Sequence, residues 1–192
     1  EIVESFPEDT PIVFGPDRNL GSYINGLTGR NMVLWDGACH VHEEFSVEKI
    51  LQLKAEHPGA KVLAHPECKG AVKALADKVG STAALLKFSI NDEATEFIVA
   101  TESGILHEMQ KAAPQKTFLP APPDDSTCAC NECNFMRLIT LKKLYNTLKY
   151  EWPTIEVDAE IAAKAMGINV TFYKLLIFIV SLIQRKHYDL FI

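Results

Sequence analysis

Short apolar segments typical of strands alternate with helical segments between residues 11 and 119, and this alternation constrains the fold most. We expect strands at 11–14, 32–35, 61–65, 96–101 and 116–119, with helices at 20–27, 47–57, 71–79, 81–88 and 105–112. A strand–helix–strand order favours parallel pairing, with helices covering both faces of the sheet. The pattern therefore predicts an α/β fold, a three-layer αβα sandwich with a mostly parallel sheet.

The expected site lies at one edge of that sheet. Active sites of open parallel sheets lie beyond the carboxyl ends of the strands. Residues 36–42, 65–67 and 101–102 each follow an expected strand and carry polar side chains. We therefore expect these three loops to form a single site.

Composition and charge narrow the class of protein. The chain has 192 residues, 47% of them hydrophobic, with a net charge of −6, which indicates one globular domain with room for a smaller second piece. The acidic balance argues against nucleic acid as a partner. The apolar run at 175–183 is too short to span a bilayer, which needs about 20 residues, so we expect no membrane role. An interface helix or a foreign terminus explains this tail better.

The cysteines are the strongest chemical signal. Cys128, Cys130 and Cys133 lie within six residues, and the total of five cysteines cannot pair completely into disulfides. Such spacing favours a metal or redox centre. The alternatives are an iron–sulfur cluster with one iron left open, a zinc site that also uses Cys39, and spare buried thiols.

Two short motifs have both a chemical and a purely structural interpretation. His65 and Glu67 can act as an acid/base pair, or Glu67 can simply cap a helix. The hydroxyls of Ser81 and Thr82 open a helix, where they can bind an anion or serve as an ordinary N-cap. Cys68 is expected to be a buried packing thiol.

Three further polar residues carry weaker signals, and we interpret them as structural: Thr101, Glu102 and His107. A weak internal repeat is also present. Residues 13–17 and 62–67 each run from a strand through a proline and an acidic residue into a helix. Cys39 and Cys133 also occupy similar places before a helix, which predicts repeated domains that each deliver one cysteine.

Five blocks in order give the sequence a family resemblance. Residues 35–45, 64–68, 80–82, 98–105 and 128–133, the last with Met136 and Arg137, resemble quinolinate synthase over about residues 1–165. The resemblance implies three similar α/β domains around a [4Fe–4S] cluster, each domain giving one cysteine and one iron left open as a Lewis acid. It also implies the condensation of iminoaspartate with dihydroxyacetone phosphate to quinolinate, in NAD biosynthesis.

The resemblance assigns roles to individual residues. It implies that Cys39 and Cys133 are cluster ligands and that His65 and Glu67 are catalytic, Glu67 as an acid/base. The implied substrate-binding residues are His42, Ser81 and Thr82. Asn134 departs from the family, which often has proline there, and the roles of Cys128 and Cys130 stay open.

The same resemblance implies a domain organisation. We expect a remnant of the middle domain at 1–38, the final α/β domain at 39–133, C-terminal helices at 134–166 and an atypical apolar tail at 167–192. The chain then lacks a first domain and is expected to be inactive alone. Competing interpretations are a non-enzymatic zinc-binding module and an inactive truncated product. The implied partner is an aspartate-oxidising enzyme. The resemblance also implies that the protein lies in the cytoplasm if it is bacterial, or in the plastid if it is plant-like.

Overall fold

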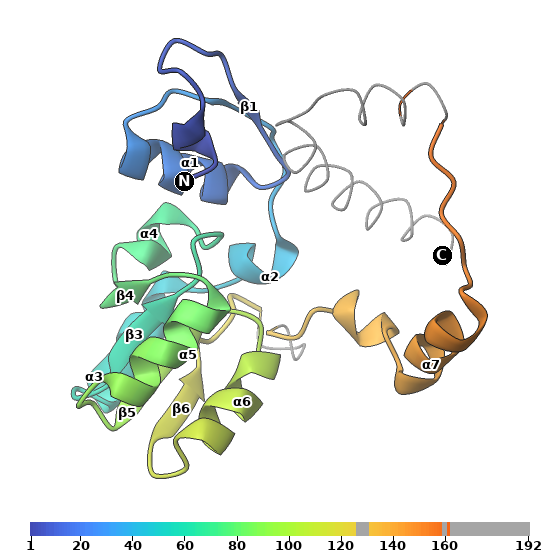
Figure 1. Cartoon of the computed structure of the whole chain (residues 1–192). Coiled ribbons are helices and arrows are strands. Elements are labelled where there is room, and N and C mark those ends of the chain that lie inside the picture. Colours follow the sequence, from blue (N-terminus) through green and yellow to red (C-terminus); the bar gives the residue numbers. More distant parts are fainter. Residues whose placement is uncertain (126–130, 159–160, 162–192) are drawn as a thin grey trace. The chain divides into compact units, whose positions relative to one another are not determined.

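A computed structural model of the chain describes residues 1–125, 131–158 and 161 (Figure 1). The chain divides into two compact units. The larger unit is Pro11–Cys133, and the smaller combines Glu1–Thr10 with the segment that begins at Asn134. Each unit is described by itself.

The larger unit contains two parallel sheets. Its main sheet has the strand order β4-β3-β5-β6, formed by β3 (Lys61–Ala64), β4 (Lys78–Val79), β5 (Glu96–Ala100) and β6 (Thr117–Pro120). A second parallel pair joins β1 (Val13–Phe14) to β2 (Val33–Leu34). Every strand pair named here is parallel, which confirms the predicted α/β class.

Helices cover both faces of the main sheet (Figure 1). On β3, Val62 and Ala64 pack into one hydrophobic cluster with residues of α3 (Val47–Glu56), while Leu63 faces a second cluster. That second cluster is closed by α5 (Thr82–Asn91) and α6 (Gly104–Ala112). Because neighbouring strand residues point to opposite faces, this split gives the predicted three layers.

Polar side chains set where several helices begin. Helix α1 (Arg18–Thr28) starts at Asp17 and ends at Gly29, whose φ of 71° lies in the left-handed region that glycine tolerates. Ser46 caps α3 and Ser81 caps α5, each accepting a hydrogen bond from the backbone three residues on. These caps agree with the predicted helix starts near residues 47 and 81.

The helix expected at 71–79 is wrong. The structure has a short helix α4 (Gly70–Lys73), and the chain then turns into β4. The amides of Asp77 and Gly80 donate to the carbonyls of Val62 and Ala64, so β4 completes an edge of the sheet. A short helix α2 (His40–Glu43) also follows Cys39 directly, before the helix expected at 47–57.

Among its described residues, the smaller unit contains three short elements: the 3-10 helices η1 (Val3–Ser5) and η2 (Met136–Leu138) and the helix α7 (Leu141–Tyr150). The first of the C-terminal helices expected at 134–166 is therefore divided. Thr140 caps α7 and separates it from η2. Of the C-terminal helices expected at 134–166, residues 159–160 and 162–166 lie outside the described residues, as does the whole tail 167–192. No helix in the described ranges is both long enough and apolar enough to cross a bilayer.

Candidate active site and metal centre

Three side chains from separate segments converge at the carboxyl edge of the main sheet. Ligand atoms of Cys39, His42 and Glu67 all lie within 4.8 Å of one another. Glu67 follows β3, and His42 contacts Thr101, the residue after β5. The chain leaves β3 for β4 on one side and returns to β5 on the other, so this edge is the topological switch point where α/β sheets bind ligands.

His42 lies at the centre of the group. Its side chain is 7% exposed, with Nε2 3.1 Å from the Thr101 hydroxyl and Nδ1 3.2 Å from a Glu67 carboxylate oxygen. Burial by itself lowers the pKa of His42, but the hydrogen bonds and charges of Cys39 and Glu67 outweigh it and raise the pKa to about 9. His42 is therefore a cation at neutral pH, beside an anion.

The two titratable neighbours of His42, Glu67 and His65, are held in different charge states. The hydrogen bond from His42 holds the pKa of Glu67 below its usual range, so Glu67 stays ionised. Burial, with the repulsion of cationic His42, lowers the pKa of His65, whose ring stacks on His42 at 4.6 Å between centroids. The backbone amide of Glu67 donates to Nδ1 of His65 at 3.3 Å, which leaves the imidazole proton on Nε2.

The loop that carries Cys39 is held by a buried carboxylate. Asp17 is 4% exposed, and its Oδ2 accepts the Cys39 amide at 2.8 Å. Its Oδ1 accepts the Leu20 amide at 2.7 Å, inside the first turn of α1. The position of Cys39 is thus tied to the start of a helix.

The segment that carries Cys133 is held in a comparable way. Glu102 accepts the Cys133 amide at 3.4 Å, and the Asn131 carbonyl accepts the Ser103 amide at 2.8 Å. The Asn131 side chain donates to the Ala121 carbonyl at 2.8 Å. These contacts place Cys133 against the loop after β5, on the edge that also carries Thr101.

The residue types at the site are ones that commonly bind a metal through a thiolate. Cys39 and Cys133 are free, half-buried cysteines that pack against the same hydrophobic cluster. Nδ1 of His42 is buried and lies 3.2 Å from a Glu67 carboxylate oxygen, so the imidazole belongs to the same group of donor atoms as the Cys39 thiol. The group within 4.8 Å contains Cys39 but not Cys133, and Cys128 and Cys130 lie outside the described residues.

Ser81 and Thr82 lie on the same edge of the sheet, beyond β4. The Gly80 amide donates to the Ala64 carbonyl, which sets the start of α5 beside the end of β3. The Ser81 hydroxyl accepts the Ala84 amide at 3.3 Å, so it serves as the N-cap. Both side chains are exposed. Their role in anion binding stays a prediction.

Sequence reasoning missed part of the site. Thr101, interpreted as structural, is 2% exposed and contacts His42 directly. Asp17 was noted only as part of a repeat, although it holds Cys39. The signal for Thr101 was its place directly after a buried strand at the switch point. Cys68 is fully buried, as predicted, and its thiol donates to the Ala100 carbonyl.

The fold and the site define an α/β protein with a thiol, imidazole and carboxylate centre beyond the carboxyl ends of parallel strands. A family model described as "Quinolinate synthetase A protein" matches residues 1–169, and the chain belongs to this family of enzymes. The resemblance seen in the sequence is thereby confirmed.

Curated relatives named quinolinate synthase occur in several bacteria. The protein of Synechococcus sp. is 55% identical over 166 residues, covering 86% of this chain and 52% of the relative. That of Thermosynechococcus vestitus is 54% identical over 166 residues, with the same coverage. That of Chloroherpeton thalassium is 51% identical over 165 residues, covering 86% of this chain and 51% of the relative. The chain thus spans about half the length of these relatives.

Proposed function

We propose that this chain contributes to a quinolinate synthase, which condenses iminoaspartate with dihydroxyacetone phosphate to form quinolinate for NAD biosynthesis. The observation that carries the proposal is the convergence of Cys39, His42 and Glu67 at the switch point of a sheet in this family. Each of the three was assigned to the site from the sequence alone.

Cys39 and Cys133 are the proposed cluster ligands in this chain. Cysteine thiolates are the usual ligands of [4Fe–4S] clusters, and both thiols are half-buried against one core. A cluster with one iron free of protein ligands supplies a Lewis acid for substrate oxygen. The family's third ligand would come from sequence beyond the matched half.

The protein side chains supply charge and proton transfer. Cationic His42 is suited to hold a substrate carboxylate, because its positive charge is buried and fixed by Thr101. Ionised Glu67 can accept a proton, while neutral His65 can donate its Nε2 proton. The free amides at the start of α5, with Ser81 and Thr82, would bind the phosphate of the second substrate.

The chemistry of the first substrate implies a partner. An imine of aspartate forms by two-electron oxidation of the amino acid, and imines hydrolyse in water. An aspartate-oxidising enzyme that works beside this protein would supply the imine before it hydrolyses. No nucleic acid is required by any part of the site.

A second function has one observation in its favour. Sulfur, nitrogen and carboxylate donors within 4.8 Å, as in Cys39, His42 and Glu67, are also a ligand set that zinc accepts with a fourth position open. A zinc-binding module without catalysis is therefore the competing proposal. Iron with acid-labile sulfide supports the first function, and zinc alone supports the second.

Complementation with part of a relative tests the enzymatic proposal. This chain is co-expressed with the part of the Synechococcus sp. relative that it does not cover, in a bacterium that lacks quinolinate synthase. We expect quinolinate from the pair and none from either half alone, because a catalytic site must be assembled in full before it positions substrate. The matched control replaces Cys39 by serine in the same pair. If the control pair produced quinolinate as well as the unmodified pair, the cluster assignment would be wrong.

A further inference from the structure

Two acidic residues stand in equivalent places before the two cysteines assigned to the metal centre. Asp17 follows β1 and precedes α1, and Glu102 follows β5 and precedes α6. After α1 the chain forms β2, which pairs in parallel with β1 and precedes Cys39. After α6 it forms β6, which pairs in parallel with β5 and precedes Cys133. The order of strand, acid, helix, strand and cysteine is therefore repeated within the described residues.

Each carboxylate makes the same pair of contacts. One oxygen of Asp17 accepts the Leu20 amide at the start of α1, and the other accepts the Cys39 amide at 2.8 Å. One oxygen of Glu102 accepts the Gly104 amide at the start of α6, and the other accepts the Cys133 amide at 3.4 Å. A single side chain thus joins the first turn of a helix to the backbone of a cysteine.

We propose that Asp17 and Glu102 are positioning residues that fix the backbones of Cys39 and Cys133 for metal binding. The role given to the cysteines rests on the proposed function, whereas the fixing of their backbones does not. Because a helix is rigid, a loop that is hydrogen-bonded to the start of a helix is held in a defined position. A helix N-terminus also stabilises the negative charge that these carboxylates bring near a metal thiolate.

The contact has a second consequence for the metal. An amide that donates to a carboxylate is less available to donate to a metal-bound sulfur. Hydrogen bonds to sulfur and nearby charge both tune iron–sulfur centres. We therefore expect Asp17 and Glu102 to raise the electron density on the two metal-bound sulfurs, besides setting where they lie.

Asp17→Ser separates positioning from ordinary helix capping. Serine is a good N-cap, so α1 keeps its cap, but the shorter side chain cannot reach the Cys39 amide as well. Amide hydrogen exchange should show lost protection at Cys39 with protection at Leu20 retained. Glu102→Ser should have the same effect at Cys133. Unchanged exchange at both cysteine amides would overturn the proposal.

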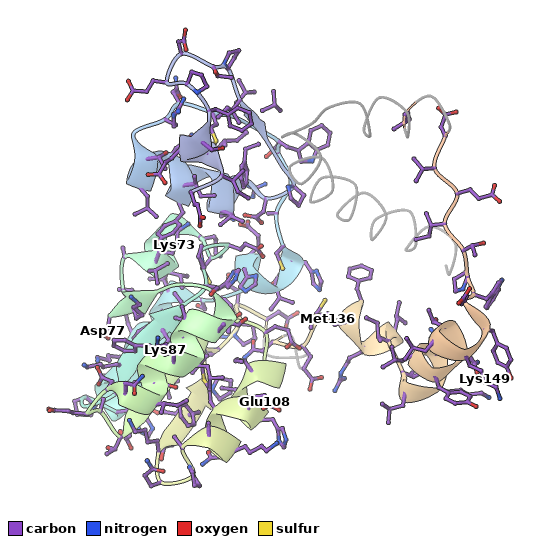
Figure 2. The ribbon with its side chains drawn as sticks, viewed as in Figure 1. Lys73, Asp77, Lys87, Glu108, Met136 and Lys149 are labelled. Carbon is purple, nitrogen blue, oxygen red and sulfur yellow. The ribbon has the colours of Figure 1, made fainter. Side chains whose placement is uncertain are left out.

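Asp77 offers a matched control in the same unit. Its Oδ2 accepts the Val62 amide at 2.7 Å, near the start of β3 and away from the site at the carboxyl end of that strand (Figure 2). Asp77→Ser removes the same kind of carboxylate–amide bond without touching a cysteine. It should lower stability and leave the exchange at Cys39 unchanged.

Cobalt(II) binding tests whether the fixed backbone matters for a metal. Thiolate-to-cobalt charge-transfer absorption reports cobalt bound to the sulfur of Cys39, whose thiol lies within 4.8 Å of ligand atoms of His42 and Glu67. Removing a residue that hydrogen-bonds to a metal ligand typically lowers metal affinity about 10- to 100-fold. We therefore expect Asp17→Ser to lower cobalt affinity by this factor and Asp77→Ser to leave it unchanged. Asp17→Glu should restore part of the affinity.

The outcomes separate the two proposals. Equal cobalt affinity of the wild-type chain and Asp17→Ser would overturn the positioning role. Absence of a thiolate band in the wild-type chain would contradict metal binding by Cys39, which the proposed function requires. The exchange at Cys39 and the alkylation rate of its thiol, compared between Asp17→Ser and Asp77→Ser, would then still decide the positioning role.

Discussion

At the residue scale, the candidate site holds three neighbouring titratable side chains in different charge states, because their surroundings shift their pKa values differently. His42 is held as a cation, Glu67 as an anion and His65 as a neutral imidazole. Groups whose pKa values are pushed apart in this way are suited to separate acid and base roles. Thr101 contributes by fixing the ring of His42 from the side opposite Glu67.

Glu67→Gln tests the proton-transfer role. The amide keeps the shape of the carboxylate but cannot accept a proton, so turnover of the complemented pair should fall by about 10²-fold or more. Iron content should stay the same, because Glu67 is not an assigned cluster ligand. Steady-state quinolinate formation and iron analysis of the same preparation measure both. Near-normal turnover would leave Glu67 with a structural role in the loop after β3.

The thiols should differ sharply in reactivity. Burial raises the pKa of the Cys68 thiol to about 12, so hardly any thiolate forms at pH 8, and the side chain is closed to solvent. Cys39 and Cys133 are half-buried and should be alkylated first. Iodoacetamide labelling followed by peptide mass spectrometry measures the order, with denatured protein as control. Early labelling of Cys68 in the folded chain would contradict the structure.

At this scale the sequence predicted several residues of the candidate site, whose roles stay predictions. His42, His65, Glu67 and Cys39 were each proposed, and the structure brings them together. The loop 101–102 was expected at the site, but the contact of Thr101 with His42 and the role of Asp17 escaped because they depend on which strands are neighbours. A threonine after a strand looks the same whether or not a histidine from another loop reaches it.

At the element scale, the strand and helix pattern was predicted well where segments are long and periodic. The strands at Lys61–Ala64 and Glu96–Ala100 are buried on both faces and read as continuous apolar runs. The edge strand β4 is only Lys78–Val79 and has no apolar run, so 71–79 was assigned to a helix. Pairing with β3 decides its conformation, and that pairing is a tertiary contact absent from the local sequence.

Two glycines of α1 provide a matched test of how that helix packs. A Cβ added to Gly21 would lie 2.6 Å from Leu34 Cδ2 and 2.7 Å from Phe14 Cδ1, whereas one added to Gly26 would meet nothing within 4 Å. Gly21→Ala should therefore destabilise the protein by about 1–3 kcal/mol through overpacking. Gly26→Ala should stabilise it by about 0.5–1 kcal/mol, because alanine favours a helix. Urea unfolding measures both, and equal effects would contradict the close approach of α1 to β1 and β2.

At the scale of the whole molecule, two similar pieces deliver the two cysteines. The piece β1-α1-β2 leads to Cys39, and the piece β5-α6-β6 leads to Cys133, each within the unit Pro11–Cys133. The sequence suggested a repeat but paired residues 13–17 with 62–67, whereas the hydrogen bonds of Asp17 and Glu102 make 13–17 correspond to the segment around β5. The expected domain boundary at residue 38 stays a prediction.

The central claim is that Cys39 and Cys133 bind an iron–sulfur centre while Cys68 does not. Anaerobic reconstitution with ferrous iron and sulfide, followed by iron, sulfide and zinc analysis, tests it most directly. We expect iron with acid-labile sulfide in the wild-type chain, below one cluster per chain because the chain spans about half of its relatives. That iron should be lost in Cys39→Ser and Cys133→Ser and retained in Cys68→Ser. Zinc without sulfide, or loss of iron only in Cys68→Ser, would contradict the account.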